Sequence, residues 1–236
     1  DQRRRAFTNV SRSSQQFVRS IPYPADILSN GNFQSAWEDY LGLPISLLAP
    51  FVGLLLPNGK RLDKYGNNLT TVPLKGDLWR NQHDINKWNL HSLAQEMQVP
   101  HTTEPLGLFA AYVSQREAYN SLPYRKRQAL IPDFMFYPGF VGAQLGEMKC
   151  VHLGSSLFIR AAAGEECGPV ERRAAKVHKE YIRKARKVDA KFNDCPIDGP
   201  PGPVLKKLQE YGKIRPLVIG PFAEINKGFD SLLKEI

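Results

Sequence analysis

Ile131-Pro132-Asp133-Phe134-Met135-Phe136-Tyr137 is followed, after a short segment, by Gln144-Leu145-Gly146-Glu147-Met148-Lys149-Cys150-Val151. Both stretches are rich in the aromatic and aliphatic residues that favour β-strands, and a proline is tolerated at the start of a strand. The intervening Pro138-Gly139-Phe140-Val141-Gly142 has turn-forming residues. We therefore expect two strands joined as a β-hairpin.

Three charged residues of this hairpin have chemical interest. Side chains alternate along a strand, so Glu147 and Lys149 project from one face while Met148 points to the other. Asp133 on the first strand can approach both of them across the hairpin. Two carboxylates with no cation between them repel each other and raise the pKa of one, so a hard divalent cation such as Mg²⁺ fits the gap. In the alternative reading, Asp133 caps a turn and Glu147 and Lys149 form an ion pair, worth under about 1 kcal/mol if exposed.

The order P-D followed by E-x-K resembles the PD-(D/E)XK nuclease superfamily, which has the restriction-endonuclease-like fold, over roughly residues 110–236. The resemblance implies that Asp133 and Glu147 bind Mg²⁺ or Mn²⁺ and that Lys149 orients the attacking water, with a phosphodiester as substrate. It also implies a further acidic metal ligand from a preceding helix, for which Glu117 is the better candidate and Glu104 the weaker one. We therefore expect a Mg-dependent endonuclease that acts on DNA, with Asp133, Glu147 and Lys149 as its catalytic residues.

Residues 169–192 predict the clearest helix, because apolar residues recur every three or four positions as one buried stripe requires. The opposite side is basic, which is typical either of a solvated face or of a surface that contacts phosphates. The basic cluster at residues 125–127, just before the Asp133 strand, can likewise be interpreted as a solvated loop or as a clamp that binds phosphate. We assign eight of these residues to nucleic-acid binding: Arg125, Lys126, Arg127, Arg172, Arg173, Lys176, Lys179 and Arg183.

The remaining sequence after the hairpin predicts alternating elements. We expect helices over 204–211 and 229–236 and strands over 214–220 and 156–160. A nearly continuous apolar strand between two helices indicates a sheet buried on both faces. The expected fold class is α/β (α+β), with a restriction-endonuclease-like core over residues 106–236 in which helices flank a central mixed sheet.

Residues 1–105 are expected to form a mainly helical extension or accessory region. A helix is predicted over 77–98, and another over 106–119 opens the core. The abrupt start at Arg3-Arg4-Arg5, without an initiator Met, suggests a processed fragment of a larger polyprotein or of an element-encoded complex. The run 171–233 also resembles nuclease-like domains of eukaryotic proteins, some of them linked to mobile elements.

An apolar stretch without charge extends from residue 41 to residue 59, close to the length that a bilayer requires. Pro44, Pro50 and Pro57 argue against a membrane span, and we expect a buried helix or helical hairpin instead. A partner surface at residues 41–56 is the alternative. It would make the chain a structural or interaction module.

The formal net charge is +9 and the sequence pI is near 9.5, which favours a polyanionic partner such as nucleic acid. Anionic membranes or acidic proteins would be attracted as well. We expect no membrane partner, an intracellular and nuclear location rather than secretion, and a homodimer, because one metal site cuts one strand at a time. A catalytically inactive nucleic-acid-binding protein with the same fold is the main alternative function.

A zinc site is a further alternative for the second half of the chain. Cys150, His152, Cys167 and Cys195 have suitable ligand atoms but lack the C-x-x-C spacing that makes such a prediction strong. Three cysteines without regular spacing are more typical of reduced thiols than of a disulfide framework.

Overall fold

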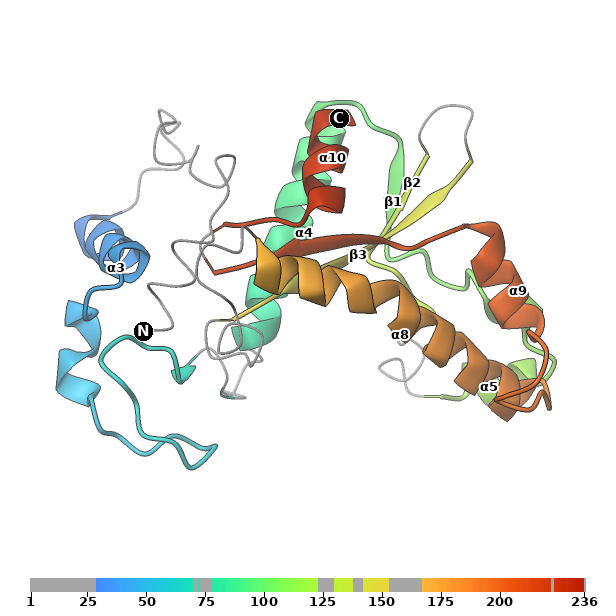
Figure 1. Cartoon of the computed structure of the whole chain (residues 1–236), viewed down its shortest axis with the longest axis horizontal. Coiled ribbons are helices and arrows are strands. Elements are labelled where there is room, and N and C mark those ends of the chain that lie inside the picture. Colours follow the sequence, from blue (N-terminus) through green and yellow to red (C-terminus); the bar gives the residue numbers. More distant parts are fainter. Residues whose placement is uncertain are drawn as a thin grey trace. The chain divides into compact units, whose positions relative to one another are not determined.

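The structure is a computed structural model (Figure 1) that describes residues 29–69, 72, 78–122, 130–137, 142–152, 167–221 and 223–235. The chain forms two compact units, each made of several segments. The first comprises Asp1–Ile85, Cys150–Arg172 and Ile219–Ile225, and the second comprises Asn86–Lys149, Arg173–Val218 and Asn226–Ile236. The predicted strand at 156–160, the basic cluster 125–127 and the loop 138–141 lie outside the described residues.

The architecture is mixed α/β and is built on one four-stranded mixed sheet, as expected. The strands are β1 (His101–Thr103), β2 (Phe134–Phe136), β3 (Gln144–Cys150) and β4 (Arg215–Ile219), and they lie in that order. The pairs β1/β2 and β2/β3 are antiparallel, and β4 runs parallel to β3 (Figure 1). The pairing of the two strands predicted for the hairpin is therefore confirmed.

Gly146 explains why β3 can lie tightly between its neighbours. A Cβ atom at this position would lie 3.0 Å from Phe136 of β2 and 3.2 Å from Leu217 of β4. Contacts this short leave no room for a side chain without movement of both neighbours. The glycine directly before Glu147 thus lets the side chains of β2 and β4 close over β3.

The helix predicted over 169–192 is confirmed as α8 (Gly168–Phe192). Its apolar stripe packs against β3, because Val177, Tyr181 and Ala185 share one buried cluster with Leu145. Side chains alternate on a strand, so Glu147 and Lys149 lie on the same face of β3 as Leu145. The face of β3 that carries the charged pair is therefore the face that α8 covers.

Two further helices support β4. α9 (Pro203–Glu210) precedes the strand and buries Val204, Leu205 and Leu208, while α10 (Lys227–Glu235) follows it. Asn226, at the start of α10, accepts the Val218 backbone N–H at 2.8 Å through Oδ1. The elements predicted for 204–211, 214–220 and 229–236 are therefore confirmed, with boundaries shifted by one or two residues.

α4 (Leu78–Glu96) confirms the helix predicted over 77–98. The helix predicted over 106–119 is wrong, because this region contains only the 3₁₀ turn η5 (Ala110–Tyr112) and the short α5 (Arg116–Asn120). The residues between them bond elsewhere: the Ser114 N–H donates to Asn193 Oδ1 at 2.6 Å and the Gln115 N–H donates to the Phe192 carbonyl at 3.2 Å. The end of α8 thus takes the donors that a continuous helix would have used.

β1 was not predicted, and it lies before residue 106. His-Thr-Thr is too short and too polar to show strand periodicity. Because β1 pairs with β2, the sheet includes residues that the sequence assigned to the N-terminal extension. The domain boundary at residue 105 stays a prediction.

The described N-terminal part of the first unit contains α3 (Asn30–Leu41) and η3 (Ser46–Phe51). The buried helix or helical hairpin expected within residues 41–59 is wrong, since no α-helix follows Leu41 there and Leu47, Phe51 and Leu54 are exposed. Pro50 and the left-handed backbone of Gly53 prevent a regular α-helix there. Within the described ranges, no helix is both long and apolar enough to cross a bilayer.

Candidate active site

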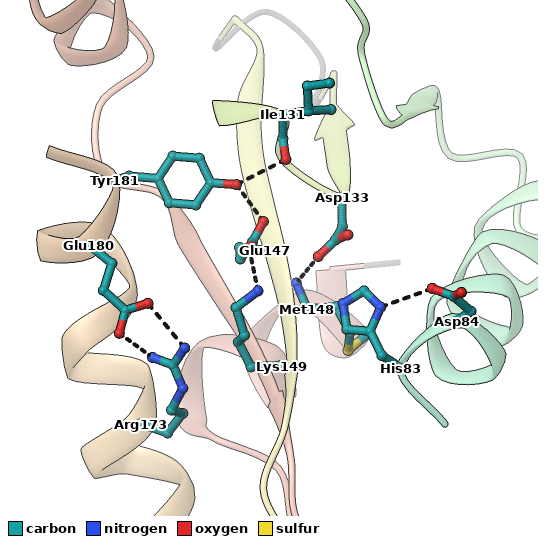
Figure 2. Close-up of polar contacts among 10 residues, drawn as sticks. All are labelled: His83, Asp84, Ile131, Asp133, Glu147, Met148, Lys149, Arg173, Glu180 and Tyr181. Atoms are coloured by element: carbon teal, nitrogen blue, oxygen red, sulfur yellow. Dashed lines mark hydrogen bonds and ion pairs between the residues drawn. The ribbon is translucent and has the colours of Figure 1, made fainter. Parts of the chain in front are cut away.

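Asp133 lies directly before β2, at the position where the β2/β3 pairing places it opposite Glu147. Phe134 pairs with Gly146, so one further step of the antiparallel register matches residue 133 with residue 147. Directly opposed residues have Cβ atoms about 4.5–5.5 Å apart and point to the same face. Asp133 is 9 % exposed, and its Oδ2 accepts the Met148 backbone N–H at 2.8 Å. This bond fixes the carboxylate against β3 (Figure 2).

Glu147 is the most enclosed charged group of the site, with 5 % of the residue exposed. Figure 2 shows its carboxylate between the Lys149 ammonium, which donates to Oε1, and the Tyr181 hydroxyl, which donates to Oε2 at 2.5 Å. The same hydroxyl lies 3.1 Å from the Ile131 carbonyl oxygen. Tyr181 therefore connects α8 to both strands of the hairpin.

The electrostatics of Glu147 combine opposing effects. Burial raises its pKa above the usual value, and the nearby Asp133 charge raises it further, while Lys149 and the Tyr181 hydrogen bond lower it. Burial and the Glu147 charge likewise raise the pKa of Tyr181 well above its usual value. Tyr181 thus stays a neutral hydrogen-bond donor throughout the physiological pH range.

The donor set suits a hard divalent cation. Of the three predicted catalytic residues, Asp133 and Glu147 carry carboxylates and only Lys149 carries a positive charge. Carboxylate oxygens are the ligands that Mg²⁺ and Mn²⁺ prefer. In the part of the chain that the structure describes, no three His, Cys, Asp or Glu side chains gather as a complete metal cage. Mg²⁺ commonly binds through one or two carboxylates and completes its shell with water and substrate phosphate.

Glu117 does not lie beside the carboxylate pair. It is exposed on α5, and α5 lies at the far end of α8, where Tyr119 packs against Phe192 with ring centroids 5.5 Å apart. Tyr181, which contacts Glu147, lies about 16 Å away along the helix at 1.5 Å per residue. The structure therefore does not bring Glu117 to the carboxylate pair, because the helix expected to carry it toward the hairpin does not form.

Glu104 lies closer to the carboxylate pair. Its backbone N–H donates to the Asp133 carbonyl at 3.0 Å, so the register row runs from Glu104 through Asp133 to Glu147. Its backbone is left-handed, with φ of 45°, and its carboxylate accepts from the buried Lys87 of α4 at 2.6 Å. The Glu104 side chain thus anchors α4 rather than adding a third carboxylate to the pair.

The predicted nucleic-acid-binding residues of α8 divide into two groups. Arg173 is held by Glu180 in a two-pronged ion pair, with N–O distances of 2.9 and 3.1 Å (Figure 2). Lys176, Lys179 and Arg183 are exposed instead, and Arg172 is half-buried. Arg125, Lys126 and Arg127 lie outside the described residues.

Sequence reasoning placed Tyr181 in the buried stripe of α8 and missed its contact with Glu147. A tyrosine in a stripe whose other members carry no polar side-chain atom is a usable signal, because a buried hydroxyl normally needs a hydrogen-bond partner. Lys184, one turn further along α8, was missed as well. It follows the helical period of the stripe yet is charged, which marks it as a residue that faces the sheet at the edge of the buried surface.

The three cysteines form no disulfide, and the zinc alternative has no support among the described residues, where no cluster of three potential ligands occurs. Comparisons with protein-family models, curated proteins and solved structures found no match. The resemblance to the PD-(D/E)XK superfamily therefore stays a prediction that depends on the residues and contacts described above.

Proposed function

We propose that this chain is a metal-dependent nuclease that hydrolyses phosphodiester bonds of DNA. The observation that carries the proposal is the proximity of the Asp133 and Glu147 carboxylates, with Asp133 held by the Met148 N–H and Lys149 donating to Glu147. The three residues together have a formal charge of −1 in a largely buried place. The repulsion between the two buried carboxylates is costly, and a divalent cation between them would relieve it and attract a phosphodiester.

Each residue has a role that fits its contacts. Asp133 and Glu147 would hold Mg²⁺ or Mn²⁺, which when bound polarises the phosphate and activates a water molecule. Lys149, whose ammonium donates to Glu147, would exchange that bond for a bond to the attacking water. Tyr181 holds the second oxygen of Glu147 and thereby fixes the direction of the carboxylate.

The exposed face of α8 supports a nucleic-acid substrate. Lys176, Lys179, Arg183 and Lys187 recur every three or four residues and are exposed, and none of them forms an ion pair with any residue that the structure describes. We call these four residues the basic row. Cations without protein partners are available to displace counter-ions from a phosphate backbone, which is the main source of non-specific affinity for DNA.

One observation favours a second candidate, a DNA-binding protein without catalytic activity. Lys149 and Tyr181 already satisfy both oxygens of Glu147, so the carboxylate is paired without a metal ion. In that case the basic row would bind DNA while the carboxylate pair served only the fold.

A cleavage assay separates the two candidates. The protein is incubated with plasmid and with single-stranded DNA in Mg²⁺, Mn²⁺ or EDTA, and Asp133→Ala and Lys149→Ala are compared with Asp230→Ala and Lys234→Ala. The last two break the Lys234–Asp230 ion pair on α10, 2.6 Å in length, and control for the loss of one aspartate or one lysine outside the site.

We expect metal-dependent cleavage that disappears in the Asp133 and Lys149 variants and persists in both controls. Binding without cleavage, unchanged by all four substitutions, would establish the second candidate instead. A protein that neither cuts nor binds DNA would contradict both.

A further inference from the structure

Lys184 lies one turn after Tyr181 on α8, at the edge of the candidate active site. Its ammonium is 4.7 Å from the centroid of the Tyr181 ring, and the hydroxyl of that ring donates to Glu147. The side chain is half-buried. A cation above the face of an aromatic ring is attracted by the ring quadrupole, so Tyr181 holds Lys184 and Glu147 in one fixed arrangement.

Each carboxylate near Lys184 in the described part of the chain is already paired with another cation, so the Lys184 ammonium has no acidic partner of its own there. Glu147 and Glu180 are the two carboxylates that act on it electrostatically. Glu147 is already paired with Lys149, and Glu180 is paired with Arg173 through both oxygens. Lys184 itself forms no hydrogen bond or ion pair with the residues that the structure describes.

Burial carries a cost that the other basic residues of α8 avoid. It lowers the pKa of Lys184, against the opposing effect of the Glu147 charge. Neighbouring cations of the helix are either exposed, as in the basic row, or paired, as Arg186 is with the Ile197 carbonyl at 2.5 Å. A half-buried ammonium without an acidic partner of its own is suited to an anion that arrives from solution.

We propose that Lys184 binds a non-bridging oxygen of the phosphodiester that is cleaved, as a second cation beside the carboxylate pair. The inference rests on the proposed nuclease function and assigns to it a catalytic residue that contacts the substrate. Lys149 is bonded to a carboxylate and is assigned to the water, which leaves the Lys184 ammonium available for the phosphate. Lys184 also adjoins Arg183 in sequence, which connects the basic row with the site along a single helix.

The test compares two lysines of α8 that make the same type of contact. Lys184→Met removes the ammonium but keeps most of the apolar stem. Lys191→Met does the same where the ammonium lies 5.1 Å from the Phe192 ring, about 10 Å further along the helix and away from Glu147. Lys184→Arg keeps the charge, and Lys187→Gln removes a member of the basic row.

Single-turnover cleavage of a labelled DNA duplex is measured in Mg²⁺ at rising protein concentration, after thermal unfolding has shown that each variant is folded. We expect Lys184→Met to lower the limiting rate at saturating protein about 100- to 1,000-fold, as loss of a charge-stabilising donor typically does. Lys184→Arg should recover most of that loss. Lys187→Gln should raise only the protein concentration that gives half of the limiting rate. Lys191→Met should leave the limiting rate unchanged.

The outcomes distinguish the two proposals. If the wild type cuts, Lys149→Ala does not, and Lys184→Met cuts at the wild-type limiting rate, then the role of Lys184 is wrong and the nuclease function stands. An equal loss in Lys184→Met and Lys191→Met would also overturn the role, because the effect would then not depend on the site. A wild type without metal-dependent cleavage would overturn the nuclease function and the role of Lys184 with it.

Discussion

Tyr181 combines two functions in one side chain. Its ring belongs to the buried cluster that joins α8 to β3, and its hydroxyl donates to Glu147 at 2.5 Å. A phenylalanine would keep the packing and lose only the donor. The position therefore separates the contribution of the hydrogen bond from that of the core.

We predict that Tyr181→Phe shifts the pH dependence of cleavage to higher pH. The Tyr181 hydrogen bond lowers the pKa of Glu147, so its removal raises that pKa and more alkaline conditions are needed for the carboxylate form that binds metal. The single-turnover rate from about pH 5 to about pH 9 measures the shift. Tyr211→Phe, which alters a tyrosine whose ring faces Lys207 and Phe109, is the control. An unshifted or acid-shifted profile in Tyr181→Phe would show that the hydroxyl does not support the carboxylate.

At the residue scale, the sequence predicted that Asp133 and Glu147 lie near each other but not which side chains surround them. Asp133 and Glu147 could be predicted because strand alternation and a hairpin fix which residues oppose each other. The contact between Tyr181 and Glu147 could not be predicted, because α8 follows an intervening segment and its rotation about its own axis depends on tertiary packing. The failure of Glu117 has the same origin in contacts made by the end of α8.

At the scale of elements, α8 and α9 are joined by one buried carboxylate. Asp189 is 2 % exposed, and its two oxygens accept the Val204 and Leu205 backbone N–H groups at 3.0 and 2.9 Å, at the start of α9. Gly202 lies so close that a Cβ atom there would be 2.4 Å from the Asp189 Cγ. Helix N-termini need such acceptors, and the negative charge suits the helix dipole.

We predict that Asp189→Ala lowers the free energy of unfolding by about 2–3 kcal/mol, because two buried N–H groups lose a charged acceptor. Urea denaturation measures the change. Asp230→Ala, which removes a partly exposed ion pair with Lys234, should cost less than about 1 kcal/mol. Equal costs for the two variants would mean that the Asp189 cap contributes no more than a surface pair.

The elements that the sequence predicted correctly are those with a strong local pattern. α8 shows a regular apolar period over its whole length, and β3 lies between a turn-rich segment and a long helix. The region 106–119 shows a helical pattern as well, but its backbone donors bond to Phe192 and Asn193. β1 is a strand because it pairs with β2. That pairing cannot be predicted from three mostly polar residues.

At the scale of the whole molecule, the sheet brings segments distant in sequence into one row of acidic residues. The continued register joins Glu104, Asp133 and Glu147, and the Glu104 carboxylate pairs with Lys87. The mixed α/β class could be predicted because its elements alternate along the sequence. The balance of charge around Asp133 and Glu147 could not be predicted, because it depends on which cationic side chains lie near them in the folded chain.

The central claim is that Asp133 and Glu147 share one divalent cation, and a crystal grown with Mn²⁺ and a DNA duplex tests it most directly. We predict one anomalous difference peak within about 2.0–2.6 Å of a carboxylate oxygen of each residue, the usual range for such cations. The peak should be absent from crystals of Glu147→Gln grown in the same way. Manganese that contacts only one of the two carboxylates, or that occurs only elsewhere on the protein, would contradict the account.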